Sequence, residues 1–465
     1  MPSASTIQTL TQLSYLIAAA LFILGLKRMS SPVTAVSGVR WAGVGMLLAT
    51  IVTLAFMGAS SLNLMLVIIA IAIGTVIAWV SGKRVAMTDM PQMIALYNGM
   101  GGGAAAAIAA VELYSGNEHN PVHLTMAAVG GFIGAVSFSG SLIAFAKLQG
   151  LITKSVRFSG QKFVNLAILL ITVGFGFMVV SGVGAESGLP VVSLLFVFAL
   201  ILGVAMTLPI GGADMPVVIS LYNALTGLAV GFEGFVLDNA AMIIAGTVVG
   251  SAGTLLTQLM AKAMNRSLGN VLFSNFGETS VAGGGAAGTQ KPIEASDAGV
   301  MMAYSQKIII VPGYGLAVAQ AQHKVWELTQ LLIDHGVKVR FAIHPVAGRM
   351  PGHMNVLLAE AGVPYDLISD LDEINAEFET ADVALIIGAN DVVNPDARTN
   401  KGSPIFGMPI LNADKAKNVI VIKRGQGQGF SGIDNALFVL DQTRMLYGDA
   451  QAAVSQLIQA VKAAG

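Results

Sequence analysis

DMPQMIALYN at residues 89–98 and DMPVVISLYN at residues 214–223 are two copies of one segment. Each copy opens a run of about 20 mostly apolar residues, the length that crosses a bilayer. An acid lies just before a proline, which suits the first turn of a helix, and an asparagine follows roughly two turns later. Polar side chains within a bilayer are costly unless they face a bundle interior or a wet cavity. The repeat therefore predicts a paired polar site inside a membrane domain.

The composition supports a membrane protein. Of 465 residues, 54% are hydrophobic and 11% are charged, whereas an average soluble domain has about 25% charged residues. The net charge of −1 conceals an uneven layout, because charge is sparse in residues 1–270 and ordinary after them. Nothing in this balance indicates a nucleic-acid partner, and none is expected. The absence of cysteine excludes disulfides, thiolate metal sites and cysteine nucleophiles, and no metal site is expected.

Nine apolar stretches approach bilayer length. They are residues 12–27, 41–57, 62–80, 91–112, 124–146, 163–183, 190–209, 216–237 and 240–260. The first is interpreted as a retained span and not as a signal peptide, because residues 1–11 have no basic region and no small-residue cleavage site follows. Methionine and phenylalanine on these stretches are interpreted as packing residues.

The charges of the connections predict the orientation of the spans. Lysine and arginine fall only in alternate connections, at Lys27, Arg28, Arg40, Lys83, Arg84, Lys147, Lys154, Arg157, Lys162, Lys262 and Arg266. The opposite connections carry Asn63, Glu112, Glu118, His119, His123, Glu186 and Asp238. The positive-inside rule then predicts that the N-terminus lies outside and the C-terminal part is cytoplasmic. The expected localisation of this multi-pass protein is the inner cell membrane. The two histidines are expected to be solvated; a metal pair is the alternative.

The repeat extends into the span after each copy. Both following spans are rich in glycine with similar endings, at Gly130, Gly134 and Gly140 in one and Gly246, Gly250 and Gly253 in the other. Small residues at this spacing allow helices to pack closely. Both copies begin on the same predicted side, so we expect a parallel repeat about an axis near the membrane normal.

The sequence changes character after the last span. We assign residues 1–267 to a transmembrane domain, 268–303 to a flexible linker rich in small residues, and 304–465 to a cytoplasmic domain. Strands are expected at residues 307–311, 337–344, 383–387, 418–422 and 436–440, and helices at 316–335, 354–361, 371–378 and 449–462. The predicted fold is a polytopic α-helical membrane bundle followed by an α/β Rossmann-like domain with a doubly wound parallel sheet.

A glycine turn in this domain indicates a nucleotide. Gly313 and Gly315 lie between the first strand and the first helix, where helix amides can hold a pyrophosphate, although Val318 replaces the third glycine of the dinucleotide fingerprint. A tight turn without a ligand would look the same. The second strand leads into HPVAGR, which has no acid for a ribose hydroxyl, whereas Lys423 and Arg424 suit a 2′-phosphate. NADP is therefore favoured over NAD; the alternative is a solvated Lys-Arg pair.

Several motifs together resemble one family. They are the two DMP segments, AMNRS at 263–267, PGYG at 312–315, HPVAGRMPGHMN at 344–355, GAND at 388–391 and KR at 423–424. The chain resembles, over nearly its whole length, the β subunit of proton-translocating NAD(P) transhydrogenase. The resemblance implies that this chain binds NADP(H) and that a partner α subunit binds NAD(H). It implies Si-Re-specific hydride transfer between the two nicotinamides, coupled to inward proton movement. The implied assembly is a dimer of αβ protomers in the bilayer, with a separate small membrane α subunit.

The resemblance also implies site residues. For NADP(H) these are Gly313, Tyr314, Gly315, Val318, Val346, Ala347, Gly348, Arg349, Met350, Pro351, Gly388, Ala389, Asn390, Asp391, Val392, Lys423, Arg424, Gly425, Gly429, Phe430, Gly448 and Asp449. Asp391 is the implied protonation-sensitive coupler, although Asn390 and Asp391 also suit a plain turn. In the membrane the matching positions are Asn98, Asp214, Asn223 and Arg266. As an alternative, Asp89 and Asp214 are helix N-caps.

Two positions depart from the family pattern. Asn98 stands where some members have a histidine thought to relay protons, and asparagine cannot titrate. Either the relay group lies on a partner membrane subunit, which we favour, or the pump is uncoupled. Phe430 stands where a lid tyrosine is common, so a hydroxyl contact is lost.

Two other classes of function compete with this prediction. One is a transporter or channel regulated by a nucleotide-sensing Rossmann domain, which would need no second nicotinamide. The other is a membrane-anchored NADP dehydrogenase with an organic substrate, which would need a substrate domain that the sequence does not indicate.

Overall fold

The computed structural model describes residues 4–56, 60–115, 120–152, 156, 158–182, 189–211, 214–265, 269, 288–350, 352–403, 405–425 and 434–464. The chain divides into two compact units. The helical unit comprises residues 1–210 and 218–257, and the sheet unit comprises residues 211–217 and 258–465. Each unit is described by itself.

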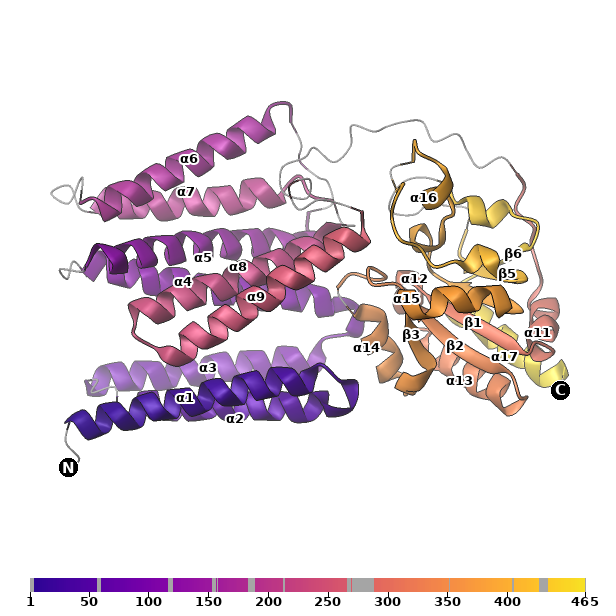
Figure 1. Ribbon diagram of the computed structural model, residues 1–465, viewed down its shortest axis with the longest axis horizontal. Helices are drawn as coiled ribbons and strands as arrows, with labels where there is room; N and C mark the ends of the chain where they lie inside the picture. The colour runs from indigo at the N-terminus through magenta and orange to yellow at the C-terminus, as the bar shows by residue number, and fades with distance from the viewer. Residues whose placement is uncertain are drawn as a thin grey trace. The chain divides into compact units, whose positions relative to one another are not determined.

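Nine helices among the described residues are long and apolar enough to cross a bilayer, as the sequence predicts. They are α1 (Ala4–Met29), α2 (Pro32–Phe56), α3 (Ser61–Arg84), α4 (Met90–Ser115), α5 (Pro121–Leu148), α6 (Gln161–Val180), α7 (Leu189–Thr207), α8 (Met215–Val236) and α9 (Ala240–Ala263) (Figure 1). A short 3-10 turn, η1 (Met87–Asp89), leads into α4. The chain is a multi-pass membrane protein.

Glycines set the closest helix contacts of the helical unit. Between α4 and α5, a Cβ on Gly102 would lie 2.9 Å from the carbonyl oxygen of Gly134. Between α8 and α9, a Cβ on Gly246 would lie 2.4 Å from the backbone nitrogen of Gly231. The expected close packing of the glycine-rich spans is therefore present in both helix pairs. Helix α5 is the most buried of the nine and forms the centre of the unit.

The sheet unit contains a six-stranded parallel sheet in the order β3-β2-β1-β4-β5-β6. Its strands are β1 (Lys307–Pro312), β2 (Lys338–Ile343), β3 (Ile368–Asp370), β4 (Val383–Ile387), β5 (Asn418–Lys423) and β6 (Thr443–Tyr447). Its helices are α11 (Ala295–Ala303), α12 (Tyr314–Val318), α13 (Gln322–Asp334), α14 (His353–Glu360), α15 (Leu371–Ile374), α16 (Asp396–Thr399) and α17 (Ala450–Ala464). This strand order is that of a dinucleotide-binding Rossmann fold.

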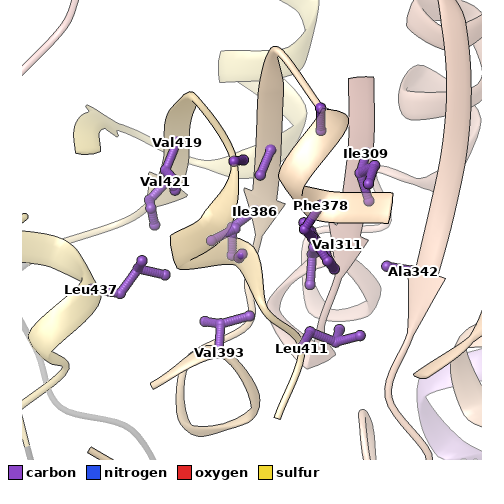
Figure 2. Packing of buried hydrophobic residues seen from close by; sticks show 14 of the residues in the cluster. Ile309, Val311, Ala342, Phe378, Ile386, Val393, Leu411, Val419, Val421 and Leu437 are labelled. Carbon is purple, nitrogen blue, oxygen red and sulfur yellow. The ribbon is translucent and has the colours of Figure 1, made fainter. Parts of the chain in front are cut away.

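Helices and turns cover both faces of the sheet, so its central strands are apolar throughout. Helices α13 and α17 pack together and contact β2 and β5. A hydrophobic core packs Ile309, Ile386 and Val421 of the sheet against Phe378 and Leu437 of the covering turns (Figure 2). Each such buried side chain contributes roughly 1.5–3 kcal/mol of transfer free energy. This burial on both faces explains the continuous apolar runs of β1, β4 and β5.

Three predicted elements differ from the structure. The helix expected at 316–335 is broken into α12 and α13, because Gln320 takes a left-handed backbone with φ 49°. The helix expected at 371–378 becomes α15 followed by the 3-10 turn η4 (Asn375–Thr380). The strand expected at 436–440 is wrong: it is the 3-10 turn η7 (Ala436–Val439), where the Asn435 side chain accepts a hydrogen bond from Leu437 N at 2.9 Å. The sixth strand comes later, at β6, and the short β3 was not anticipated.

The segment expected to be a linker carries ordered structure near its end. Helix α11 packs against α17, and Ile293 N donates to Met445 O at 3.0 Å. Ordered structure of the sheet unit thus begins before residue 304. Residues 270–287 lie outside the described residues, and the domain limits stay predictions.

Candidate functional site

The strand order creates a crevice at one point of the sheet. Strands β1 and β4 are neighbours, and the chain leaves them toward opposite halves of the sheet. In open α/β sheets, ligands bind beyond the carboxyl ends of the strands at such a switch point. The two segments that follow β1 and β4 are PGYG and GAND, which sequence analysis singled out separately. The fold brings them together.

The glycines of these segments pack directly on one another. Gly315 N donates to Gly388 O at 3.1 Å, and Gly313 N donates to Ile387 O at 2.9 Å. A Cβ on Gly313 would lie 2.3 Å from Gly388 O, and a Cβ on Gly388 would lie 2.4 Å from the Cα of Gly315. Gly388 also has φ 67°, a conformation that favours glycine. Glycine is therefore required at these positions for the two turns to pack together, whether or not a ligand also lies close to them.

A buried histidine fixes the loop after β2. His344 Nδ1 accepts from Val346 N at 3.2 Å, and its Nε2 donates to Pro409 O at 2.8 Å. Both ring nitrogens are thus used by a neutral imidazole. Burial lowers the pKa of His344 from 6.5 to about 4, against a smaller opposing effect of the hydrogen bond to Pro409. His344 holds the base of the loop that carries the predicted nucleotide residues from Val346 onward.

The same loop places a cation beside the first glycine turn. The Arg349 guanidinium lies 4.4 Å from the centre of the Tyr314 ring, a cation–π contact. Arg349 N donates to His353 Nδ1 at 3.1 Å, and the rings of Tyr314 and His353 are 6.2 Å apart. Burial and the nearby Arg349 charge lower the pKa of His353, so its imidazole is neutral. The predicted residues of β1 and of the β2 loop therefore form one cluster, with positive charge at the crevice.

The ends of β4 and β5 supply opposite charges. Lys423 is the last residue of β5, and its ammonium lies 4.7 Å from the Phe438 ring. Burial lowers the pKa of Lys423, while the charges of Asp434 and Asp391 oppose that shift. Asp391 begins the 3-10 turn η5 (Asp391–Val393) after β4. The predicted coupler and the predicted phosphate ligand therefore interact electrostatically in the structure.

The remaining predicted nucleotide residues are placed as follows. Gly448 N donates to Lys423 O at 3.0 Å, which ties the end of β6 to that of β5. The Asp449 carboxylate accepts from Gln451 N at 3.0 Å in the first turn of α17, which is the geometry of a helix N-cap. Arg424 and Gly425 are exposed beyond β5. Pro351, Gly429 and Phe430 lie outside the described residues, as does Arg266 of the membrane set.

The burial of His344 predicts a pH-dependent stability. Its folded pKa lies below the ordinary value, so the unfolded chain binds the proton first. The associated stability is present above pH 6.5 and is lost as pH falls toward about 4. Between pH 7 and pH 5 we expect a loss of about 2 kcal/mol in the unfolding free energy of the sheet unit. The measurement is urea unfolding in detergent, with Trp41 and Trp79 replaced by phenylalanine so that Trp326 reports on the sheet unit.

The matched variants for this test are H344Q and H335Q. H344Q removes the titration, so most of the pH dependence should disappear; His353, whose pKa is shifted in the same direction, accounts for a remainder. His335 is exposed, and H335Q should behave like the unmodified chain. An undiminished loss of stability in H344Q would contradict the assignment.

In the helical unit, a chain of polar contacts joins α4, α5 and α8. Asn98 Nδ2 donates to Ser141 Oγ at 3.0 Å, and Thr226 Oγ1 lies 3.4 Å from Asn98 O. Thr226 and Ser137 share a hydrogen bond of 2.6 Å, and Ser137 Oγ lies 2.9 Å from Tyr222 O, to which it donates. The side-chain oxygen of Asn98 is buried and has no hydrogen-bond partner among the described residues. Of the predicted membrane residues, the structure thus places Asn98 in this series of polar contacts. Asn223 is half-buried and is not part of the series.

The two sequence copies differ in their surroundings. Tyr222 of the second copy is buried and hydrogen-bonds to Thr207 at 2.6 Å, and it occupies space that a side chain on Gly140 would fill. Tyr97 of the first copy is 38% exposed and hydrogen-bonds to Ser81. Asp214 is buried, whereas Asp89 is exposed and accepts from the Gln92 amide. The second copy is therefore the one built into the interior.

Sequence analysis missed one residue of the helical unit. Glu233 lies on α8 and is completely buried (0% exposed). Neither carboxylate oxygen has a hydrogen-bond partner among the described residues. The available signal was an acid within an apolar span, the same criterion that drew attention to Asp214 and the asparagines.

Fold and site together define a polytopic membrane protein that carries a Rossmann-type dinucleotide domain. Residues 11–460 match the family described as NAD(P) transhydrogenase beta subunit. A relative with the name NAD(P) transhydrogenase subunit beta, from Rhodospirillum rubrum, is 46% identical over 466 residues, which cover 97% of this chain and 99% of the relative. The subunit of the same name from a designated strain of that species gives the same values. The chain belongs to the transhydrogenase beta subunit family, and the resemblance seen in its motifs is confirmed.

Proposed function

We propose that the sheet unit binds NADP(H), accepts hydride directly from NADH held by a partner α subunit, and couples this transfer to inward proton movement through the helical unit. The observation that carries the proposal is the convergence of the two glycine turns, Arg349, Asp391 and Lys423 at the carboxyl edge of one Rossmann sheet. The family membership of the chain supports an α subunit as the partner.

The choice of NADP over NAD rests on the charges at the edge of the sheet. An NAD site usually has an acid after the second strand for the ribose 2′-hydroxyl. Here β2 is followed by His344, whose ring nitrogens are occupied by backbone groups. Lys423 and the exposed Arg424 lie at the end of β5, where two cations suit a 2′-phosphate. The described residues therefore fit the phosphorylated cofactor.

Direct hydride transfer between two nicotinamides requires no side-chain acid or base from the protein. The bound nicotinamide supplies the hydride-accepting carbon, and the chain must hold it against its counterpart and exclude water. In this proposal the turn after β4 positions the nicotinamide side, and the loop after β2 positions the phosphate side. Asp391 is the coupler: its electrostatic interaction with Lys423 changes with its charge, and so does the affinity for the nucleotide.

On the membrane side, Asn98 cannot carry a proton. We propose that a partner membrane α subunit supplies the titrating group and that it approaches the buried side-chain oxygen of Asn98. A donor there would satisfy an acceptor that is otherwise costly inside a membrane. The proposed orientation has the N-terminus outside and the sheet unit cytoplasmic, because lysine and arginine are confined to alternate connections. The proposed assembly is a dimer of αβ protomers.

Replacement of Lys423 tests the cofactor assignment. K423Q should weaken NADPH binding about 10- to 100-fold, since a charged hydrogen bond to phosphate contributes roughly 1.5–3 kcal/mol. The loss should be much smaller for NADH, which lacks the 2′-phosphate. Tryptophan-to-NADPH energy transfer in the detergent-solubilised chain gives both affinities.

Lys415 provides the control for this measurement. It is exposed in the 3-10 turn η6 (Ala413–Lys415), so K415Q should bind NADPH normally. Equal losses for NADPH and NADH in K423Q would argue against a 2′-phosphate contact.

The reaction itself is tested in vesicles that contain this chain and the α subunits. Hydride transfer from NADH to an NADP⁺ analogue is expected. Intact NADPH binding with no hydride transfer would instead favour a transporter regulated by the nucleotide.

A further inference from the structure

Glu233 is a buried acid that the proposed coupling does not yet use. An ionised carboxylate without partners costs several kcal/mol in an apolar interior, even after the protein relaxes. Glu233 is completely buried, and both of its oxygens lack hydrogen-bond partners among the described residues. A neutral, protonated carboxyl group is the state that fits such surroundings.

Glu233 lies on the same face of α8 as the residues that make the polar contacts of the helical unit. On α8, Tyr222, Thr226 and Glu233 face α5, because their partners there are Gly140, Ser137 and Gly130. Spacings of four and seven residues return to the same helix face. From Tyr222 to Glu233 the helix rises about 16 Å at 1.5 Å per residue. One interface therefore holds a stripe of polar groups that ends in an acid.

A glycine makes room for the carboxyl group. A Cβ on Gly130 would lie 2.2 Å from Glu233 Oε1 and 3.1 Å from the Cβ of Phe232. Only a residue without a side chain at position 130 leaves the acid in its observed place. The pocket for Glu233 is therefore part of the packing between α5 and α8.

The other titratable groups near this end of the interface come from three elements. Glu112, half-buried near the end of α4, interacts electrostatically with Glu233. His123, at the start of α5, has its ring 5.6 Å from that of Phe235 on α8. Asp238 follows α8 and is exposed. Among these groups, Glu112 is the one whose charge acts on Glu233.

We propose that Glu233 is a proton-binding residue of the translocation path. It receives a proton from the outer side through Glu112 and releases it toward the polar contacts of Thr226 and Asn98. The inference rests on the proposed function, because it needs proton movement coupled to hydride transfer. A proton requires a single base, whereas a metal ion requires several ligands. In the described part of the chain, no group of three or more His, Asp or Glu residues could hold a metal ion. The proposal places a titrating group on this chain in addition to the one expected on the partner.

The test uses the full chain with its α subunits in vesicles. E233Q keeps the shape and the neutral charge but cannot exchange a proton. We expect proton-linked hydride transfer to fall about 100-fold while NADPH binding is unchanged. E233D should restore part of the activity. G130A keeps the acid but displaces it, and it should lower turnover in the same way. D238N, which changes an exposed acid at the end of α8, is the matched control and should behave like the unmodified chain.

Infrared spectroscopy gives a readout that does not depend on turnover. The carboxylic acid C=O band, which shifts in D₂O, should lose one component in E233Q and none in D238N. Unaltered proton-linked turnover in E233Q, or an infrared band identical to that of the unmodified chain, would overturn the proposal. Failure of the proposed function is a different result: the unmodified chain itself would then transfer hydride without moving protons.

Discussion

G388A is expected to abolish NADPH binding by the sheet unit. The new Cβ would lie 2.4 Å from the Cα of Gly315 and 2.6 Å from the nitrogen of Leu316, and these backbone atoms cannot move away cheaply. The backbone of Gly388, at φ 67°, is also strained for alanine. Together the clash and the strain cost about 3 kcal/mol or more. Since Gly388 and Gly315 belong to the two turns of the crevice, the affinity for NADPH should fall at least about 100-fold.

The matched control is G402A. A Cβ on Gly402 would meet only the Asn400 side-chain oxygen, at an ordinary 3.5 Å, and this glycine is exposed. NADPH titration of both variants in detergent, followed by energy transfer from Trp326, provides the comparison. Normal binding by G388A would show that the close approach of the two turns does not form the nucleotide site.

D214N should abolish proton-linked turnover and leave NADPH binding intact. Asp214 is 5% exposed and precedes α8, the helix that carries Tyr222, Thr226 and Glu233. A buried acid is costly, and next to an apolar span it is retained where protons or charges are handled. Loss of its titration should lower turnover about 100-fold or more. N223A, one turn before Thr226, is expected to act in the same direction.

The sequence repeat supplies the control for this prediction. Asp89 occupies the equivalent position of the first copy but is exposed, and its carboxylate accepts a hydrogen bond from the Gln92 side chain. D89N should therefore keep most of the turnover of the unmodified chain. Equal effects of D89N and D214N would mean that burial does not give the two copies different roles. Normal turnover in D214N would mean that Asp214 is not part of the proton path.

Local patterns were sufficient to predict most of the fold. Nine apolar stretches correspond to nine long apolar helices among the described residues, and the apolar runs of β1, β4 and β5 became central strands. The errors occurred where side chains overrode the local pattern. Residues 436–440 are as apolar as a strand, but the Asn435 side chain caps a 3-10 turn there. Strand β6, in contrast, contains Arg444, and its apolar pattern is weaker.

The candidate site was only partly predictable. The glycine turns stood out in the sequence, but their direct contact depends on the neighbouring positions of β1 and β4, which only the sheet order shows. The difference between Asp89 and Asp214 could not be predicted, because the two copies are similar in sequence while one acid is exposed and the other is buried. Glu233 was overlooked although an acid within an apolar span could have indicated it; the structure adds that both of its oxygens lack hydrogen-bond partners among the described residues.

The most direct test of the account is to measure proton movement and hydride transfer together. Vesicles with this chain and its α subunits would enclose a pH-sensitive dye and receive NADH and an NADP⁺ analogue. If the two processes are coupled, hydride transfer should change the internal pH, and an imposed proton gradient toward the nucleotide side should accelerate hydride transfer. Hydride transfer that leaves the internal pH unchanged and ignores the gradient would contradict this coupling.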